Sequence, residues 1–223
     1  MHLFKILIIA PGRILSNVAS SLWANVLRTT DFAVHYSTRI YGHDSITIGK
    51  GFHAGPGLWI EAVHSYDGQL LSPVIVIGAR VSCSDNVHIA SSCRVILGDD
   101  VLIGSKVLIT DHNHGSYKGL GPHTGPNIPP TLRRLSYEPV YIGDRVFIGD
   151  GVVVLPGSVI GEGTVVGSNS VVCGDLPANC LCVGVPARPI RQYDEVSGCW
   201  ISCEIDFSGS FRVPPTDHVQ NSV

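Results

Sequence analysis

Two histidines, His112 and His114, stand in the run Asp111–Gly115, just before a long stretch that is rich in proline and glycine. An imidazole changes its charge near neutral pH, so it can take a proton from a substrate and later return it. In an extended strand, His112 and His114 point to one side. Asp111 and Asn113 point to the other side, where they can orient an imidazole or close a turn. The run is therefore the candidate catalytic segment.

The elements that must position this run are short repeats of six residues. An aliphatic side chain recurs at every sixth position from Ile142 to Val172, and a glycine often follows it. An earlier array passes through Ile89, skips two residues to Leu97 and ends at Ile109. A period of six fits neither a single long helix nor a single long strand, but it fits a strand and a turn repeated many times.

This period is typical of a parallel β-helix, in which three repeats close one triangular coil. The aliphatic side chain of each repeat points into the coil, and the glycine lets the chain turn where a Cβ would crowd. Each coil then buries its apolar row only against the coils beside it. We therefore expect three stacked pairs: Ile142 on Ile160, Ile148 on Val166, and Val154 on Val172.

The repeats divide the chain into three parts. Residues 1–40 lack hexapeptides, and the aliphatic spacing within 16–28 predicts a short amphipathic helix that caps the solenoid. Residues 41–191 form the β-helix domain, interrupted at 115–139 by a long loop whose five prolines and four glycines disfavour regular structure. Residues 192–223 form a C-terminal extension that is expected to be partly irregular and has no assigned role.

Composition excludes several classes of protein. The chain has 15 Lys and Arg against 18 Asp and Glu, a net charge of −3, so it lacks the basic surface of a nucleic-acid binder. The seven cysteines are odd in number, which favours buried thiols in a reducing compartment over a disulfide framework. The N-terminal apolar run is too short to span a bilayer. We expect a cytoplasmic protein, with peripheral association at the inner face of the membrane as a further option.

Residues 44–191 resemble the hexapeptide-repeat acyltransferases, and within them the lipopolysaccharide (O-antigen) and capsular polysaccharide O-acetyltransferases. The shared stretches are Ile48–Phe52, Asp111–Gly115 and Gly184–Arg188. The resemblance implies an all-β fold, a left-handed parallel β-helix with a short helical N-terminal cap and a long projecting loop. The left hand comes from the family and not from the period.

The implied activity is an acetyl-CoA-dependent O-acetyltransferase that acts on a sugar hydroxyl of a lipopolysaccharide, O-antigen or capsular polysaccharide precursor. Family members place a catalytic histidine at the start of the projecting loop, and the register counted from Val107 favours His114, with His112 as its rival. The histidine would take the proton of the hydroxyl while the oxygen attacks the acetyl carbonyl. Transfer would be direct, without an acyl-enzyme.

The resemblance also implies a homotrimer with active sites at the subunit interfaces, acetyl-CoA as co-substrate, and no metal. Three polar side chains would follow the pantetheine arm, two glycines would allow close backbone approach, and two arginines would face the phosphates. Where relatives carry Thr-Lys, this chain has Cys-Gly, so one charge that faces the phosphates is missing. The polar side chains are Ser105, Asp150 and Ser168, the glycines are Gly149 and Gly167, and the arginines are Arg188 and Arg191. The Cys-Gly pair on the cofactor side is Cys173 and Gly174.

The acceptor is expected to be a saccharide held by short polar groups and by an aromatic ring in the loop. The candidates are Ser84, Asp85, Asn86, Asn113 and Tyr117.

Other functions on the same fold stay open at this point. One is acetylation of another small acceptor, such as an amino sugar or an antibiotic. Another is a zinc-dependent carbonic anhydrase of the gamma type, in which His88, His112 and His114 would bind the metal at a trimer interface. The proline-rich loop after His114 and the Gly184–Arg188 run favour the transferase.

Overall fold

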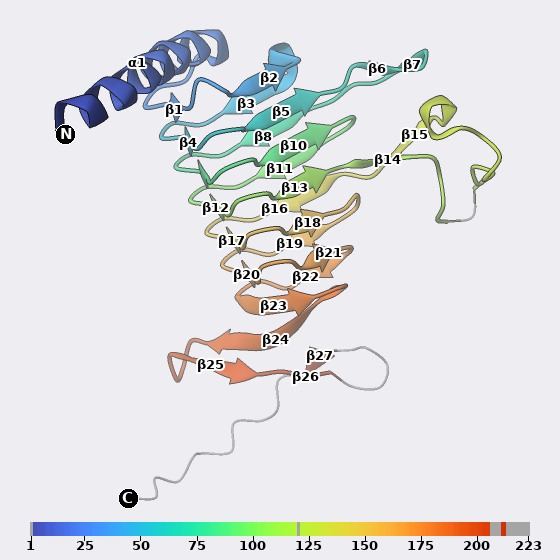
Figure 1. The fold of residues 1–223 in the computed structure, drawn as a ribbon. Coiled ribbons are helices and arrows are strands. Elements are labelled where there is room, and N and C mark those ends of the chain that lie inside the picture. Colours follow the sequence, from blue (N-terminus) through green and yellow to red (C-terminus); the bar gives the residue numbers. More distant parts are fainter. Residues whose placement is uncertain (1, 120, 206–210, 213–223) are drawn as a thin grey trace, which may run out of the picture.

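The computed structural model describes residues 2–119, 121–205 and 211–212 (Figure 1). Short parallel strands stack coil upon coil into a three-sided prism, and each side is a parallel sheet, which on one side is extended at its C-terminal end by two antiparallel strands. We call the sides sheets A, B and C, in the order in which a coil runs from A to B to C. The A/B corner is the set of turns that lead from a strand of sheet A to the next strand of sheet B. The B/C corner is the set of turns and loops that lead from a strand of sheet B to the next strand of sheet C.

Each sheet gathers every third strand of the solenoid. Sheet A runs β1 (Ala33–Val34), β4 (His53–Ala54), β9 (Ser82–Cys83), β12 (Leu102–Ile103), β17 (Phe147–Ile148), β20 (Val165–Val166), β23 (Cys180–Gly184), β24 (Ala187–Asp194) and β25 (Cys199–Ser202). Sheet B runs β2 (Arg39–Tyr41), β5 (Trp59–Ala62), β10 (His88–Ser91), β13 (Leu108–Thr110), β18 (Val153–Val154) and β21 (Val171–Val172). Sheet C runs β3 (Ile46–Ile48), β8 (Ile75–Ile77), β11 (Val95–Leu97), β16 (Val140–Ile142), β19 (Val159–Ile160) and β22 (Asp175–Leu176).

The remaining elements are hairpins and single turns outside the three sheets. The strands are β6 (Ser65–Tyr66) with β7 (Gln69–Leu70), β14 (His112–His114) with β15 (Leu135–Tyr137), and β26 (Glu204–Ile205) with β27 (Phe211–Arg212). The 3-10 turns are His43–Ser45 and Pro130–Leu132.

The core is the stack of aliphatic side chains inside the prism. All three predicted pairs are in register, namely Ile142 with Ile160, Ile148 with Val166, and Val154 with Val172. These side chains are almost completely buried, and burial of such rows is the main stabilising contribution of the solenoid.

The glycine that follows the aliphatic residue in many repeats is needed because the neighbouring coil lies very close to it. At Gly104 an added Cβ would lie 2.7 Å from the backbone nitrogen of Asp150 in the next coil. Real Cβ atoms do not approach backbone atoms so closely, so a larger residue here would force the coils apart.

Helix α1 (His2–Leu27) lies across the N-terminal end of the prism (Figure 1). The predicted cap over 16–28 is correct in place but too short. The spacing that marks an amphipathic helix begins only near Ser16, because the preceding sequence is apolar at most positions and shows no such spacing. Trp23, Ala24 and Leu27 pack against the core, and the Ser20 hydroxyl accepts a hydrogen bond from the Val34 N–H at 2.9 Å.

The long loop contains more regular structure than predicted. Strand β15 pairs antiparallel with β14, so that Asn113 lies opposite Ser136 and His114 opposite Leu135. The expectation that 115–139 lacks regular structure is therefore wrong at β15 and at the turn Pro130–Leu132. The partner strands are separated by a long proline-rich connection, so no short-range hairpin signal exists.

The C-terminal extension is also more regular than expected. After Arg191, strand β24 continues to Asp194, and β25 pairs with it antiparallel. The rings of Tyr193 and Trp200 meet edge to face at 5.4 Å. The tail from Pro214 onward lies outside the described residues. Within the described part of the chain, no helix is both long enough and apolar enough to cross a membrane.

Candidate active site

Two excursions leave the prism, and both leave from the B/C corner. The first is the hairpin β6–β7 after β5, and the second is the segment 111–139 after β13, which we call the arm (Figure 1). The catalytic candidates lie at the point where the arm departs. The solenoid therefore carries this segment on a rigid, repeated frame.

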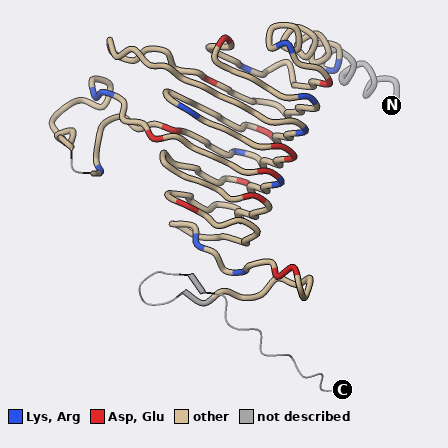
Figure 2. Tube along the Cα trace, turned by 180° about the vertical axis from the view of Figure 1, so that it is seen from behind, with Lys and Arg blue, Asp and Glu red and all other residues tan. Residues whose placement is uncertain are grey.

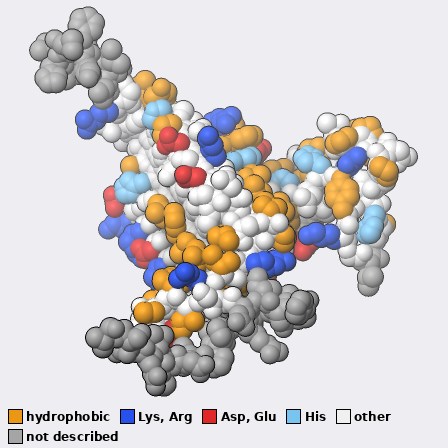
Figure 3. All heavy atoms as spheres, turned by 60° about the horizontal axis from the view of Figure 1, so that its bottom comes forward, with side chains coloured by type: hydrophobic (Ala, Val, Ile, Leu, Met, Phe, Trp, Pro, Cys, Tyr) orange, Lys and Arg blue, Asp and Glu red, His pale blue; other side chains and the backbone are white. Residues whose placement is uncertain are grey.

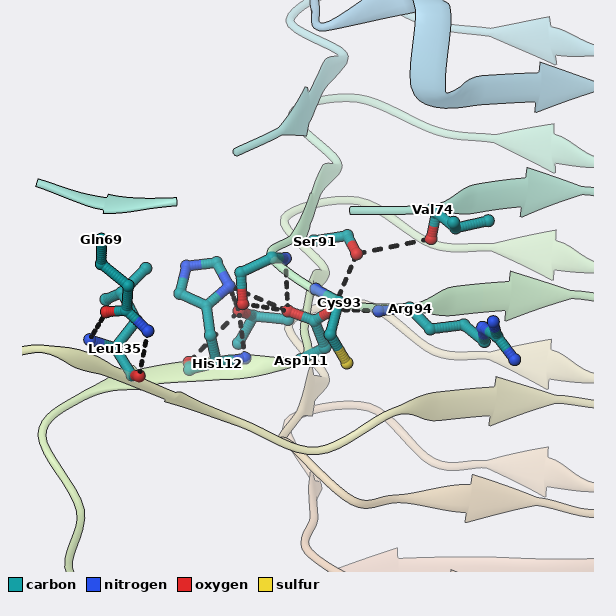
Figure 4. A network of polar contacts seen from close by, with 10 residues as sticks. Gln69, Val74, Ser91, Cys93, Arg94, Asp111, His112 and Leu135 are labelled. Atoms are coloured by element: carbon teal, nitrogen blue, oxygen red, sulfur yellow. Dashed lines mark hydrogen bonds and ion pairs between the residues drawn. The ribbon is translucent and has the colours of Figure 1, made fainter. Parts of the chain in front are cut away.

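Asp111 is the first residue of the arm, and its carboxylate is completely buried. Oδ1 accepts a hydrogen bond from the N–H of Ser92 at 2.7 Å. Oδ2 accepts from the Ser91 hydroxyl at 2.7 Å and from the N–H groups of Cys93 and Arg94 at 2.8 and 2.6 Å (Figure 4). We call these donors of Ser91–Arg94 the cradle. It was not predicted from the sequence, although the two extra residues between Ile89 and Leu97 in the hexapeptide array are a signal for it.

The cradle keeps Asp111 ionised. Burial opposes the charge of the carboxylate, but hydrogen bonds from His112, from Ser91 and from the backbone N–H groups of Ser92 and Cys93 outweigh it. Together they lower the pKa of Asp111 to about 2. A buried negative charge therefore stands at the root of the arm at neutral pH.

His112 is the partner of this charge. Its Nδ1 lies 3.0 Å from Oδ1 of Asp111, and its side chain is only 13% exposed. The Thr110 hydroxyl lies 3.3 Å from the same nitrogen. A proton on Nδ1 that is donated to the carboxylate leaves the lone pair on Nε2, which is the arrangement a general base needs.

His114 has a different environment, farther along the arm. It is exposed, and its ring meets Tyr66 of the β6–β7 hairpin edge to face at 4.9 Å. Its backbone carbonyl accepts a hydrogen bond from the Tyr117 hydroxyl, which also accepts one from Arg133. Among the described residues, no carboxylate pairs with the His114 ring. Asp111 therefore orients the rival histidine and not the one that the sequence register favours.

The hairpin β6–β7 braces the arm. Gln69 accepts a hydrogen bond from the Leu135 N–H at 2.8 Å and donates one to the Leu135 carbonyl at 3.1 Å. The Tyr66 hydroxyl donates to the carbonyl of Thr131 at 3.2 Å. No sequence signal pointed to Tyr66 or Gln69, because these contacts join segments more than sixty residues apart.

The residues expected to follow the pantetheine arm and most of those expected to hold the acceptor share the A/B corner. These residues lie in successive turns of this corner, each turn one coil further along the prism than the one before. Neighbouring turns are in contact, since the Ser105 N–H donates a hydrogen bond to Oδ1 of Asp150 at 2.6 Å. A Cβ added at Gly149 would lie 2.7 Å from the Ser168 nitrogen. The members of this column are Ser84, Asp85, Asn86, Ser105, Gly149, Asp150, Gly167 and Ser168.

The other predicted residues lie elsewhere. Cys173 and Gly174 follow β21 and so share the B/C corner with the histidines. Asn113 and Tyr117 line a cavity of about 220 Å³ between the arm and the coil that follows it. Within one chain, sheet B separates the histidines from the A/B column, so the structure does not bring the two sets together.

The two arginines lie beyond the last coils. Arg188 and Arg191 are exposed on β24. Arg191 lines a hollow with Val165, Leu181 and Trp200, on a face where apolar side chains gather (Figure 3). Arg191 therefore borders an apolar surface, and neither arginine stands at the A/B corner.

His88 lies on the outer face of sheet B, stacked on Trp59 with ring centroids 4.0 Å apart. Burial lowers its pKa, and the charges of Arg39 and His112 lower it further. In the described part of one chain, His88, His112 and His114 are not gathered into a cluster that could hold a metal ion. A zinc site of the carbonic anhydrase type would need ligands from more than one chain. All seven cysteines are free thiols, and burial raises the pKa of Cys83 to about 12.

Comparison with known proteins decides the family. The bacterial transferase hexapeptide family of six repeats matches residues 139–174. WbbJ of Escherichia coli K12, which carries the name of a lipopolysaccharide biosynthesis O-acetyl transferase, is 44% identical over 167 residues, 75% of this chain and 82% of WbbJ. The chain belongs to the hexapeptide-repeat acetyltransferases.

Solved structures agree with this acetyltransferase fold. The S84A mutant of AntD, an N-acyltransferase from Bacillus cereus, is 20% identical with a TM-score of 0.60, covering 79% of this chain and 90% of AntD. The hexapeptide-repeat acetyltransferase VCA0836 from Vibrio cholerae is 21% identical with a TM-score of 0.51, covering 81% and 82%. The predicted left-handed parallel β-helix is confirmed.

Proposed function

We propose that this acetyltransferase moves an acetyl group from acetyl-CoA to a sugar hydroxyl of a lipopolysaccharide, O-antigen or capsular polysaccharide precursor. The observation that carries the proposal is the Asp111–His112 pair at the root of the arm, in a chain 44% identical to WbbJ. An alcohol needs a base to become a competent nucleophile, and this pair has the chemistry to supply one. The seven free thiols fit the cytoplasm, the compartment we propose for the reaction.

We assign the base to His112. Nε2 takes the proton of the sugar hydroxyl while the oxygen attacks the acetyl carbonyl carbon of the thioester. The tetrahedral intermediate collapses, the carbon–sulfur bond breaks, and the imidazolium returns the proton to the sulfur. The products are an acetyl ester and free CoA, with no acyl-enzyme. Asp111 stabilises the imidazolium that forms during the reaction.

The alternative is His114, which the register counted from Val107 favours. An exposed imidazole without a carboxylate partner can rotate between rotamers, so it must be ordered by the substrate before it can react. His112 is already held by Asp111 at 3.0 Å, and this preorganisation supports it as the base. His114, next to Tyr66, suits a role in acceptor contact.

The separation of the two corners supports a homotrimer with shared sites. The histidines occupy the B/C corner, and the column that contains Ser105, Asp150 and Ser168 occupies the A/B corner of the same face of the prism. A threefold arrangement with sheet B facing the axis brings the A/B corner of one chain against the B/C corner of the next. Acetyl-CoA would then bind along the A/B column and present its thioester to His112 of the neighbouring chain.

Mixed trimers test this shared site. One chain carries His112→Ala, and the other carries Ser168→Trp, which blocks the A/B column. Each variant alone should be inactive, whereas co-expressed chains should recover about one quarter of the wild-type activity, because random assembly places two intact corners together at that frequency. Two inactive variants that stay inactive in mixed trimers, confirmed by mass to contain both chains, would overturn the shared site.

The acceptor is tested with labelled acetyl-CoA. The purified protein is incubated with isolated lipid-linked O-antigen precursors and with the free saccharides, and the product is treated with mild hydroxylamine. An O-acetyl ester releases its label under these conditions, whereas an N-acetyl amide retains it. Label in a hydroxylamine-stable product would show an amino-sugar acceptor. No transfer to any saccharide, with acetyl-CoA still bound, would overturn the proposed acceptor class.

A further inference from the structure

Helix α1 presents an apolar row that no part of the described chain covers. The row consists of Ile14, Val18, Leu22 and Val26, spaced four residues apart so that they share one face of the helix, with exposed fractions from 47 to 62%. The opposite face packs on the solenoid through Trp23 and its neighbours. The outward face of α1 therefore offers a continuous apolar ridge to something outside the chain.

The polar side chains beside this ridge are basic or neutral, never acidic. The neighbouring row on the same outward surface is Arg13, Asn17, Ser21 and Asn25. Neither Arg13 nor Arg28 forms an ion pair with a residue that the structure describes. Residues 1–30 contain no Asp or Glu.

Charge is also unevenly divided along the chain. Residues 1–60 contain five Lys and Arg against two Asp, whereas residues 61–223 contain ten Lys and Arg against 16 Asp and Glu. In Figure 2, acidic and basic residues are interspersed along the coils, whereas the part of the helix that is not grey carries basic residues and no acidic ones. The N-terminal end of the prism is therefore the basic end of an acidic molecule.

We propose that α1 docks on an anionic phospholipid bilayer. An amphipathic helix with an apolar row, with Arg13 beside it and Arg28 just beyond its end, can lie in the plane of the interface, with its apolar side chains among the acyl chains and the two arginines at the phosphates. The bonds between Ser20 and Val34 hold the helix against the solenoid, so only the outward face enters the lipid. A second copy of the chain fits less well, because its acid-free helix would oppose arginine with arginine.

The proposal is tested with the full-length protein and sedimenting vesicles. Wild type should bind mixed phosphatidylethanolamine–phosphatidylglycerol vesicles, and bind phosphatidylcholine vesicles at least about tenfold more weakly. Leu22→Asp should lower the partition coefficient about tenfold or more, since it places a charge in the apolar row. Val196→Asp is the matched control, because Val196 is 97% exposed at the opposite end of the molecule, and it should bind as wild type does.

A second variant keeps the apolar row intact. Arg13→Glu should weaken binding to the anionic vesicles and reduce its dependence on salt, without changing the circular dichroism spectrum. Wild type that fails to bind anionic vesicles, or Leu22→Asp that binds unchanged, would overturn the proposal. A change in molar mass by light scattering on Leu22→Asp in the absence of lipid would assign the ridge to a second copy instead. Transfer to a soluble saccharide should be unaffected by either variant, which separates this result from the proposed chemistry.

Discussion

The root of the arm and its outer part are held by different means, although they are separated by only two or three residues. At the root, Asp111 is fixed by five hydrogen bonds from Ser91–Arg94 of the preceding coil, and it fixes His112 in turn. Farther out, His114 lies against Tyr66, and the neighbouring strand β15 is held by hydrogen bonds between Leu135 and Gln69. The repeat frame therefore orders one histidine directly, whereas the other depends on a second excursion of the chain.

Replacing each histidine by alanine gives the largest expected effect. His112→Ala should lower kcat by about 10²- to 10⁴-fold, because the base and its charge stabilisation are lost together. His114→Ala should lower it by less than about tenfold. His123→Ala, which removes another histidine of the arm, serves as control and should be neutral. The opposite ranking in steady-state kinetics would reverse the roles assigned to the two histidines.

Asp111→Asn tests the link between the frame and His112. The amide cannot accept the Nδ1 proton as a carboxylate does, so kcat should fall about 10²-fold while KM for acetyl-CoA changes little. Asp144→Asn is a matched control, because Asp144 also accepts a backbone hydrogen bond, from the Asp99 N–H at 2.8 Å, but no histidine among the described residues pairs with it. Equal losses in both variants would show a purely structural role for Asp111.

Strong acid should weaken the root of the arm. The pKa of Asp111 is lowered from 3.8 to about 2 in the folded chain, so its contribution to stability is complete above about pH 4 and is lost as the pH falls towards 2. This contribution is on the order of 2 kcal/mol. Denaturant titrations should therefore show the wild type and Asp111→Asn converging in unfolding free energy below pH 4. A constant difference between them would contradict the ionised cradle.

Gln69→Ala should have the smallest effect, confined to the outer arm. It removes two hydrogen bonds to Leu135, each worth about 1 kcal/mol, so KM for the acceptor should rise a few-fold while kcat changes little. Leu70→Ala alters an exposed neighbour in the same hairpin and should leave both constants unchanged. Hydrogen exchange at the Leu135 amide provides a direct readout. Slow exchange in Gln69→Ala would show that the arm does not need this brace.

The sequence predicts the solenoid well because each repeat carries its own register. Ile142 and Ile160 stack as expected, since the side chain that must be buried recurs every six residues regardless of what lies elsewhere. The arm is different, because β14 and β15 meet across a long proline-rich connection, and the partner of Leu135 is a glutamine sixty-six residues away. Such contacts depend on the positions at which the arm and the β6–β7 hairpin leave the prism, and no local sequence pattern predicts those positions.

The site was predictable in its residue types but not in its pairing. The run Asp111–His114 contains the groups that matter, but alternation places the acid on the side opposite to both histidines, whereas Asp111 in fact contacts His112 at 3.0 Å. Alternation does not reveal that the backbone at Ser92–Arg94 closes around a carboxylate. The two extra residues before Leu97 marked the place, yet only the three-dimensional turn shows that their N–H groups converge on Asp111 and so select His112.

The C-terminal hairpin has a consequence for the behaviour of the protein in concentrated solution. A stack of parallel coils ends in strands with unpaired amide and carbonyl groups, and such an edge can template the addition of another molecule, end to end. Strand β24 runs back across β23 in the opposite direction, and β25 covers β24 in turn (Figure 1). The reversal of direction ends the helical continuation on this side of the prism, so the last parallel edge of sheet A is covered by the protein's own chain and is closed to end-to-end addition of another molecule.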